Sequence, residues 1–392
     1  MCYYCGCNKI VTKDHGRSAK YLKYLEKEIR LQSAELGGRR RVTQMHWGGG
    51  TPTFLSEAEL SELMQMIRAS FELDPHGEYS IEVDPRKVGE EKVALLGALG
   101  MNRISVGVQD FNPEVQRAVN RIQSVEETAA VMSGARLGGV RSINLDLIYG
   151  LPRQTPESFA RTLDQVIALR PDRIAAYGYA HLPERFKAQR QIDKYDLPDA
   201  STRLTLLQQT VEALTSAGYV HIGVDHFALP GDDLARALAA GTLQRNFQGY
   251  STHAACDLIG FGMSAISHVG QSFSQNAKDL VGYYAALDNG RLPVARGLWL
   301  DEDDLVRADL IQRLMCTGVI DIAAFEARHL VDFPGYFRES LDRLAPLVAD
   351  GLVERAPERI TVTARGQFLL RNIAQCFDAH AASPDIRYSR AV

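Results

Sequence analysis

Hydrophobic residues are spaced along the first half of the chain in two patterns that alternate regularly. In one pattern, apolar side chains recur every three or four residues among charged ones, as between positions 19 and 36, which predicts an amphipathic helix. In the other pattern, β-prone residues stand together in a short run, as from Val42 to Trp47, which predicts a strand. The strands predicted in this way are 42–47, 79–83, 104–108, 143–148 and 173–179.

Helix signals lie between these strands. Ser56 and Ser124 each stand three residues before a glutamate, which is the pattern of a capping box, and Thr155-Pro156 places proline at a first helical position. The predicted helices are 19–36, one opened at Ser56, 88–99, one opened at Ser124, one opened at Thr155 and one that ends at Gly218. Strands that are each followed by a helix indicate parallel βα units. We therefore expect an α/β fold that closes into a partial or complete barrel, with a doubly wound open sheet as the alternative.

The regular alternation ends near position 225. Loops rich in glycine and polar residues follow, and beyond Trp299 the pattern becomes helical again, at 305–315, 322–328 and 336–350. Two short β-prone runs, 351–354 and 359–363, precede a last helix at 366–377, which resembles a winged-helix module. We expect a barrel unit over 1–225, covering loops over 226–298 and a mostly helical, winged-helix-like unit over 299–392.

Composition narrows the class of protein. The 392 residues are 45% hydrophobic and carry a formal net charge of −4, with a calculated isoelectric point near 6.2. A net negative charge argues against general nucleic-acid binding. For the winged-helix-like unit we therefore favour a role in packing or as a lid over DNA binding. No apolar run is long enough to cross a membrane, and no signal-peptide pattern opens the chain. We expect a cytoplasmic protein without nucleic-acid partners.

Half of the six cysteines lie at the start of the chain. Cys2, Cys5 and Cys7 form a C-x-x-C-x-C loop, whereas the other three are scattered. Thiolates this close together can bind one zinc ion or one iron–sulfur cluster, and we prefer this interpretation to three unrelated thiols. A disulfide framework fits small secreted proteins better than a large chain with few cysteines.

Polar residues also stand at the ends of the predicted strands. Trp47 is followed by Gly48, Gly49, Gly50 and Thr51, and Glu82, Gln109, Asp146 and the run 177–180 end later strands. In a parallel barrel these ends converge on one mouth. The glycines permit close approach of backbone to a ligand, and carboxylates accept hydrogen bonds from an ammonium group or from ribose hydroxyls. The set suits a nucleoside that carries an amino acid, although each member alone is better explained as a turn or a helix cap.

Several motifs together resemble a known family. They are the cysteine loop with Asn8-Lys9, HWGGGTPT at 46–53, IEVDP at 81–85, RISVGVQDF at 103–111, NLDLIYGLP at 144–152 and RNFQGYST at 245–252. This ordered set resembles the radical S-adenosylmethionine enzymes, and more narrowly the oxygen-independent coproporphyrinogen III oxidases, over nearly the whole chain from Cys2 to Phe377. A related haem-chaperone branch usually lacks the Cys-Gly-Cys pair that this chain has at 5–7. A zinc-bound winged-helix DNA-binding protein is a third reading, which the acidic balance disfavours.

The resemblance implies a cofactor set. A [4Fe–4S] cluster would be held by cysteines, with Cys2 and Cys5 at the second and third ligand positions and Cys7 outside the ligand set. Two S-adenosylmethionine molecules would be contacted by residues at the family's positions, namely Tyr4, Gly49, Gly50, Thr51, Glu82, Gln109, Arg121, Asp146, Ala180 and Ile266. The cluster would cleave S-adenosylmethionine to a 5′-deoxyadenosyl radical, which would take a hydrogen from a substrate propionate.

The same resemblance implies the reaction and its partners. Two oxidative decarboxylations would convert coproporphyrinogen III to protoporphyrinogen IX, with an external reductant and an electron acceptor. We expect a monomer. Arg86, Arg103 and Arg245 are candidate partners for the substrate's propionates, and each of them could instead be a structural ion-pair partner.

One departure from the family pattern concerns the cysteine loop. The family's first cluster cysteine lies four residues before the position of Cys2, and a further strand and a cofactor-binding tyrosine precede it. We therefore expect this sequence to be a fragment in which strand 42–47 forms an exposed parallel edge with an uncovered apolar face. On that expectation the chain by itself is poorly soluble and inactive.

Overall fold

The computed structural model of the chain describes residues 1–14, 16–253 and 256–381, and its largest element is a seven-stranded sheet. The strand order is β1-β2-β3-β4-β5-β7-β6, and the first five strands are parallel. The bounds are β1 Arg41–Trp47, β2 Glu72–Val83, β3 Arg103–Gln109, β4 Ser142–Tyr149, β5 Arg173–Gly178, β6 Val220–Ile222 and β7 His226–Ala228. The predicted partial barrel of parallel strands is confirmed.

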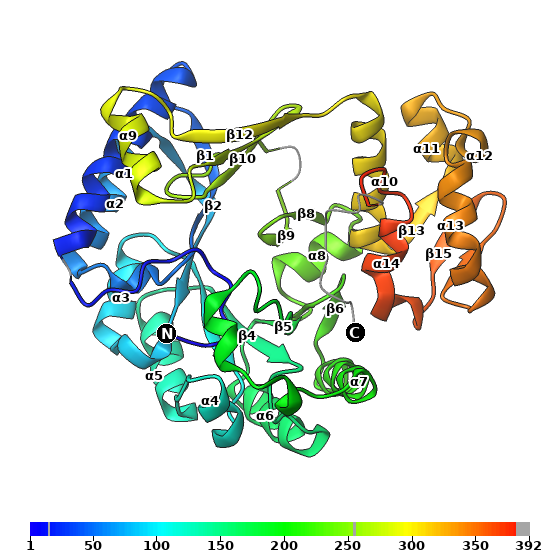
Figure 1. Cartoon of the computed structure of the whole chain (residues 1–392), viewed down its shortest axis with the longest axis horizontal. Helices are drawn as coiled ribbons and strands as arrows, with labels where there is room; N and C mark the ends of the chain where they lie inside the picture. The colour runs from blue at the N-terminus through cyan, green and yellow to red at the C-terminus, as the bar shows by residue number, and fades with distance from the viewer. Residues whose placement is uncertain (15, 254–255, 382–392) are drawn as a thin grey trace.

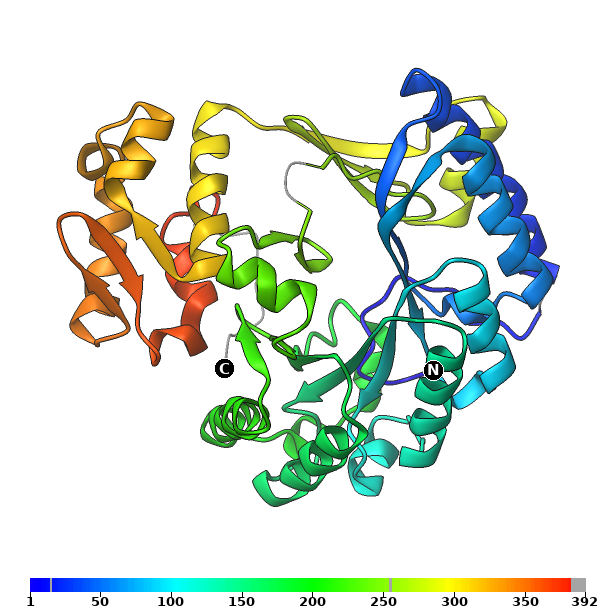
Figure 2. The same ribbon diagram turned by 180° about the vertical axis from the view of Figure 1, so that it is seen from behind.

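Helices cover the outer face of this sheet (Figures 1 and 2). They are α1 Gly16–Glu35, α2 Glu57–Ser70, α3 Glu90–Ala98, α4 Pro113–Ala118, α5 Val125–Leu137, α6 Pro156–Leu169 and α7 Ala200–Ser216. The capping boxes predicted at Ser56 and Ser124 are both present, and Thr155 caps α6. The side chains of Ile104, Ile143 and Leu145 are buried beneath these helices, so the apolar face of the sheet points outward.

Three features of the sheet differ from the prediction. β2 begins at Glu72 rather than at position 79, and a register shift in β1 between Val42 and Gln44 accommodates the extra length. β6 and β7 were not predicted: β7 joins the far edge antiparallel to β5, and β6 pairs antiparallel to β7. Two 3-10 turns, Lys187–Gln191 and Lys194–Asp196, separate β5 from α7.

β1 forms the other edge of the sheet, as expected. Its apolar face is not uncovered, however. Val42 and Met45 are half-buried and pack against the main core, and Trp47 is buried. The expectation of an uncovered apolar face is therefore wrong for these side chains. The helices α1 and α2 pack against each other and cover the part of the core that β1 borders.

The middle of the chain supplies short elements around the barrel. They are α8 Asp233–Ala239, the hairpin β8 Gln244–Asn246 and β9 Gly249–Ser251, the sheet β10 Ile266–Val269, β11 Ser272–Asn276 and β12 Val294–Trp299, and α9 Leu280–Asp288. β12 runs from α9 beside α1 across to α10, and so connects the two ends of the molecule (Figure 1). Glu28 of α1 anchors this region, because its buried carboxylate accepts hydrogen bonds from Tyr283, Asn276 and the backbone of Gly262.

The last part of the chain has a hydrophobic core of its own. It contains α10 Glu302–Thr317, β13 Val319–Asp321, α11 Ile322–His329, α12 Phe333–Tyr336, α13 Arg338–Ala349, β14 Val353–Arg355, β15 Arg359–Val362 and α14 Leu370–Gln375. The predicted two-stranded wing has a third strand, β13, and the predicted helix 336–350 is divided at Phe337. The boundaries of the three predicted parts stay predictions. No helix among the described residues is long and apolar enough to span a membrane.

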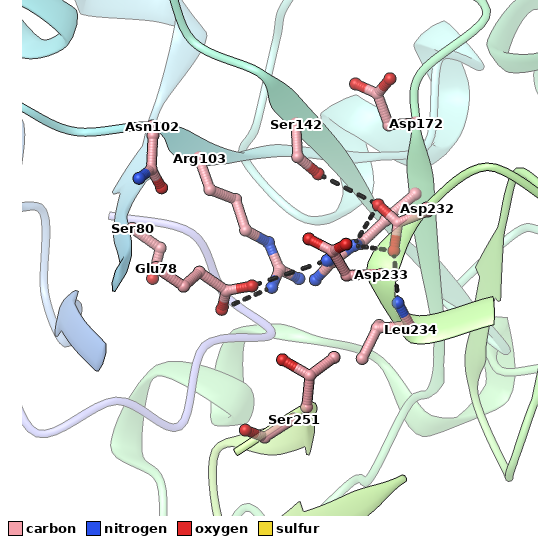
Figure 3. A network of polar contacts seen from close by, with 12 residues as sticks. Glu78, Ser80, Asn102, Arg103, Ser142, Asp172, Asp232, Asp233, Leu234 and Ser251 are labelled. Carbon is pink, nitrogen blue, oxygen red and sulfur yellow. Dashed lines mark hydrogen bonds and ion pairs between the residues drawn. The ribbon is translucent and has the colours of Figure 1, made fainter. Parts of the chain in front are cut away.

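A chain of buried charges crosses the cavity side of the sheet (Figure 3). Arg173 is 1% exposed, and its guanidinium lies 2.7 Å from Asp232 and 3.5 Å from Glu78. Glu78 also lies 2.9 Å from Arg103. Burying a charge costs free energy unless an opposite charge compensates for it, so this network holds β2, β3 and β5 together with the start of α8.

We expect Asp232→Ala to lower the free energy of unfolding by about 3–5 kcal/mol, because Arg173 would be left buried without its closest partner. Urea unfolding measures this loss. The neighbouring Asp233→Ala is the control, because Asp233 pairs with Arg236 at the surface and such pairs contribute about 0–1 kcal/mol. Equal losses in the two variants would show that the buried network does not stabilise the fold.

Candidate functional site

A large cavity of about 2700 Å³ lies inside the partial barrel. The cysteine loop, the ends of β1 to β5, the β8–β9 hairpin and the start of β10 all contribute to its wall. Of the residues that the sequence predicts for the site, the lining includes Cys2, Tyr4, Cys5, Gly49, Gly50, Thr51, Glu82, Gln109, Arg121, Asp146 and Ile266. Ala180 is not among the lining residues. The structure therefore brings the predicted residues together, while their cofactor contacts stay predictions.

The glycine turn after β1 lies against Glu82. Trp47 pairs with Ile81 across the two parallel strands, so the next residue of each strand faces the same space. The backbone N–H of Gly49 donates to Glu82 Oε2 at 3.3 Å, and His46 Nε2 lies 3.4 Å from Glu82 Oε1. Gly49 has a φ of +110°, and a Cβ there would project into open space. The side chain of Glu82 is 46% exposed and so remains accessible to a ligand.

Asp146 is the second carboxylate of the site. It accepts hydrogen bonds from Ser105 Oγ at 2.7 Å and from Asn144 Nδ2 at 2.8 Å. Burial raises the pKa of Asp146 to about 6, and the negative charge of Glu82 adds to the rise. The side-chain amide oxygen of Asn144 is buried and has no hydrogen-bond partner in the described structure, so it is available to accept a hydrogen bond from a polar ligand.

Gln109 and Arg121 lie beside a glycine of β3. Gln109 ends the strand in the left-handed region, with a φ of +69°. A Cβ on Gly107 would lie 2.8 Å from the amide nitrogen of Gln109 and 3.0 Å from Arg121, so glycine leaves the space that both side chains use. Arg121 donates to the Gly107 carbonyl and lies 3.6 Å from Asp84.

The cysteine loop is fixed to the barrel by hydrogen bonds. Tyr3 N–H donates to the Val119 carbonyl at 2.9 Å. The buried side chain of Gln189 donates to the carbonyls of Tyr4 and Ala180 at 2.9 and 3.1 Å. This bridge places Ala180 behind the loop rather than in the cavity wall. Sequence reasoning did not find Gln189, because a single glutamine in an irregular segment carries no periodic or motif signal.

The three thiols have different surroundings. Cys2 is buried, and its Sγ lies 3.6 Å from a guanidinium nitrogen of Arg86 and 3.6 Å from one of Arg121. A hydrogen bond from the Cys7 thiol lowers the pKa of Cys5 to about 5 against the opposing effect of burial. Burial raises the pKa of Tyr4. A thiolate is therefore favoured at Cys5, which is the form that binds metals.

The described side chains fit S-adenosylmethionine better than they fit a [4Fe–4S] cluster. The open glycine turn, the accessible Glu82 carboxylate and the unpartnered Asn144 carbonyl suit a polar nucleoside with an ammonium group. The described residues contain no group of three histidine, cysteine or acidic side chains placed to hold a metal ion. Cys2 and Cys5 stay predictions as cluster ligands, and the described residues do not bring a third such ligand to them.

The three arginines proposed for the substrate's propionates differ in their hydrogen-bond partners. Arg86 is hydrogen-bonded to Asp84 at 2.6 Å, and Arg103 is bound to Glu78 in the buried network. Both therefore have the alternative role of structural ion-pair partners. Arg245 lines the cavity, and its Nε is buried without a hydrogen-bond partner in the described structure.

Comparisons with known proteins agree with this fold and site. The Radical SAM superfamily model matches residues 1–166, and the model of the HemN C-terminal domain matches residues 300–369. The chain thus has the fold of a radical S-adenosylmethionine protein. The oxygen-independent coproporphyrinogen III oxidase of Pseudomonas aeruginosa is 51% identical over all of this chain and 86% of its own length. The chain belongs to the oxygen-independent coproporphyrinogen III oxidase family.

Other relatives show the same family. The Escherichia coli oxygen-independent coproporphyrinogen III oxidase is 49% identical over 97% of this chain and 83% of its own length. The solved structure of the coproporphyrinogen III oxidase from Escherichia coli, described as a radical SAM enzyme, superposes with a TM-score of 0.94 over 97% of this chain and 87% of that chain. Family membership implies a [4Fe–4S] cluster and S-adenosylmethionine as cofactors.

The raised pKa of Asp146 predicts a stability change with pH. Its folded-state pKa of about 6 exceeds the ordinary value, so the folded protein binds this proton more tightly than the unfolded chain. The contribution of Asp146 to stability must therefore fall as pH rises from about 4 to about 6. Through Asp146, the wild-type protein should lose on the order of 2 kcal/mol of unfolding free energy over this interval, and Asp146→Asn should not show this loss. Urea unfolding at a series of pH values measures the difference.

The control for this prediction is Asp164→Asn, an exposed aspartate on α6. It should leave the pH dependence of the wild-type protein unchanged. If Asp146→Asn and wild type lose stability in parallel between pH 4 and 6, Asp146 does not carry the raised pKa.

Proposed function

We propose that this protein catalyses the oxidative decarboxylation of two propionate groups of coproporphyrinogen III to vinyl groups, giving protoporphyrinogen IX in anaerobic haem biosynthesis. The observation that carries the proposal is 51% identity to a named oxygen-independent coproporphyrinogen III oxidase over all of this chain, together with a cavity lined by the family's cofactor positions. The haem-chaperone reading has no specific observation in its favour.

The residues of the site have distinct roles in this proposal. When bound, S-adenosylmethionine and the cluster supply the radical that takes a hydrogen atom from the β-carbon of a propionate. Glu82 and Asp146 accept hydrogen bonds from the ammonium group or ribose hydroxyls of the cofactor. The glycine turn at 48–50 lets the backbone approach the cofactor, and the Gln109 amide and Arg121 orient its polar groups. The walls of the barrel exclude water from the reactive centre.

The size of the cavity supports a second S-adenosylmethionine. Ordinary ligand pockets measure roughly 300–1000 Å³. The volume here, about 2700 Å³, leaves room for two nucleosides beside a tetrapyrrole. Tyr4 and Ile266 lie in different parts of the wall, at the cysteine loop and at β10, and so are available to separate cofactor molecules.

The chemistry and the thiols define the remaining partners. Loss of a hydrogen atom and of carbon dioxide leaves one electron on the product, which an external acceptor must take, and an external reductant must supply an electron for radical formation. No disulfide joins the described cysteines, which suits the reducing cytoplasm. We expect the protein to act as a monomer.

The proposal is tested with the chain extended so that a cysteine stands four residues before Cys2, reconstituted with iron and sulfide under argon. With S-adenosylmethionine, a reductant and coproporphyrinogen III, we expect a vinyl product together with methionine and 5′-deoxyadenosine. Because the described thiols do not complete a three-cysteine set, the chain without the extension should bind less iron and form less product. Haem transfer without any vinyl product would instead support the chaperone reading.

In the extended protein, Glu82→Ala should raise the apparent KM for S-adenosylmethionine by about 10- to 150-fold, the effect of losing one hydrogen bond to a charged group. Steady-state kinetics at varied S-adenosylmethionine measures this change. Glu62→Ala removes an exposed carboxylate from α2 and should leave the KM unchanged. A normal KM in Glu82→Ala would exclude Glu82 from the cofactor site.

A further inference from the structure

The cavity wall formed by β7, β8 and β9 carries a cluster that the proposed cofactor contacts do not use, and it joins Arg245, a propionate candidate from the sequence, to His226, which no motif includes. His226 begins β7, Arg245 lies in β8, and Tyr250 lies in β9. All three line the cavity. Arg245 and Tyr250 are paired residues of the β8–β9 hairpin, so their positions are fixed by the same pair of strands.

Arg245 has a guanidinium group that is held in place but not neutralised at close range. Its central carbon lies 5.5 Å from the centre of the Tyr250 ring. Its Nε is buried, and no described residue accepts a hydrogen bond from it. An unpaired buried donor on a cation is costly, and such groups usually have a ligand or ordered water as partner. Arg86 and Arg103, by contrast, are bound to carboxylates.

His226 is oriented by a neighbouring acid. Its Nδ1 lies 2.7 Å from Asp225 Oδ1, and Arg371 of α14 donates to Asp225 Oδ2 at 2.6 Å. Both oxygens of Asp225 therefore have a partner, and no ion pair joins Arg245 to Asp225 among the described contacts. The other side of the imidazole faces Gly249, where a Cβ would lie 3.5 Å from Nε2. With Nδ1 bound to Asp225, Nε2 is the nitrogen available to a ligand.

Tyr250 fixes the spacing of the two groups. Its ring lies edge-on to the His226 ring, with 5.3 Å between the two ring centroids, and the guanidinium group of Arg245 lies over the same tyrosine ring. Its hydroxyl donates to the Met315 carbonyl at 2.8 Å and accepts from Val224 N–H at 3.1 Å. The ring is thus held from both the barrel and α10. Groups fixed in this way lose little freedom when they bind a ligand.

The charge of the cluster is positive. Arg245 and Arg371 contribute two positive charges and Asp225 one negative charge. Against the opposing effect of burial, His226, Arg371 and Arg245 hold the pKa of Asp225 below its usual value, so it stays ionised. A planar guanidinium with a free Nε–H beside an imidazole matches the geometry of a carboxylate.

We propose that Arg245 and His226 form a carboxylate-binding subsite that holds one propionate group of the tetrapyrrole substrate. Arg245 donates hydrogen bonds to the carboxylate, and His226, held by Asp225 through Nδ1, faces the same propionate with Nε2. Asp225 is a positioning residue, because it acts through His226. The subsite rests on the proposed function, since it takes its ligand from the substrate named there.

The test measures binding of coproporphyrin III, the stable oxidised form of the substrate, to the whole chain by porphyrin fluorescence. Arg245→Met keeps the packing of the stem on Tyr250 and removes the charge. We expect it to weaken binding of coproporphyrin III by about 10- to 150-fold. Binding of the tetramethyl ester, in mild detergent, should change little, because the ester has no carboxylate. Arg245→Lys should recover part of the affinity, and His226→Ala should weaken binding of the acid more than that of the ester.

The control is Arg236→Ala, which removes one exposed positive charge from α8 and should leave both affinities unchanged. Circular dichroism checks that each variant is folded. The subsite is excluded if Arg245→Met binds coproporphyrin III as tightly as wild type does, or if it loses affinity for the acid and the ester equally. If wild type itself does not bind coproporphyrin III, the proposed function fails instead of the subsite.

Discussion

The parallel pairing of β1 to β5 is the constraint on which the site depends. Because neighbouring strands run in the same direction, their carboxyl ends reach one edge, and the residues that end each strand meet there. The register then decides which residues become neighbours. Trp47 opposite Ile81 places the glycine turn beside Glu82, and Gly107 opposite Asp146 places the second carboxylate beside Gln109. A one-residue slip of either pair would turn the acids toward the helices.

The two faces of the sheet have opposite character, and this follows from the period of two along each strand. Odd and even positions of β3 and β4 alternate between buried apolar residues under the helices, such as Ile104 and Leu145, and polar residues toward the cavity, such as Ser105 and Asp146. A polar inner face needs partners, since unpaired polar groups are costly away from water. The buried ion pairs of Arg173 supply such partners near the start of β5, and a bound cofactor supplies them near the strand ends.

The sequence predicts those features that depend on local pattern and fails where distant contacts decide. Periodicity and capping residues predict the parallel strands and most helix starts, because each signal lies within one element. Pro75 and Gly77 interrupt the pattern of β2, so its first half was not predicted, and the three-residue strands β6 and β7 are too short to show a period. Gln189 and His226 reach the site through partners far along the chain, and one sequence carries no signal for such contacts.

The distribution of charge around the cavity gives cofactor and substrate different places. Arg103 pairs with Glu78, and Arg86 and Arg121 share the carboxylate of Asp84, so the charges of these arginines are partly cancelled. Glu82 and Asp146 have no arginine partner among the described residues, which leaves negative charge where the proposed sulfonium cofactor binds. Arg245 leaves positive charge at the β8–β9 hairpin, where a carboxylate is attracted. A cationic cofactor and an anionic substrate would therefore be drawn to separate parts of one cavity, and the propionate would be oriented before the reaction begins.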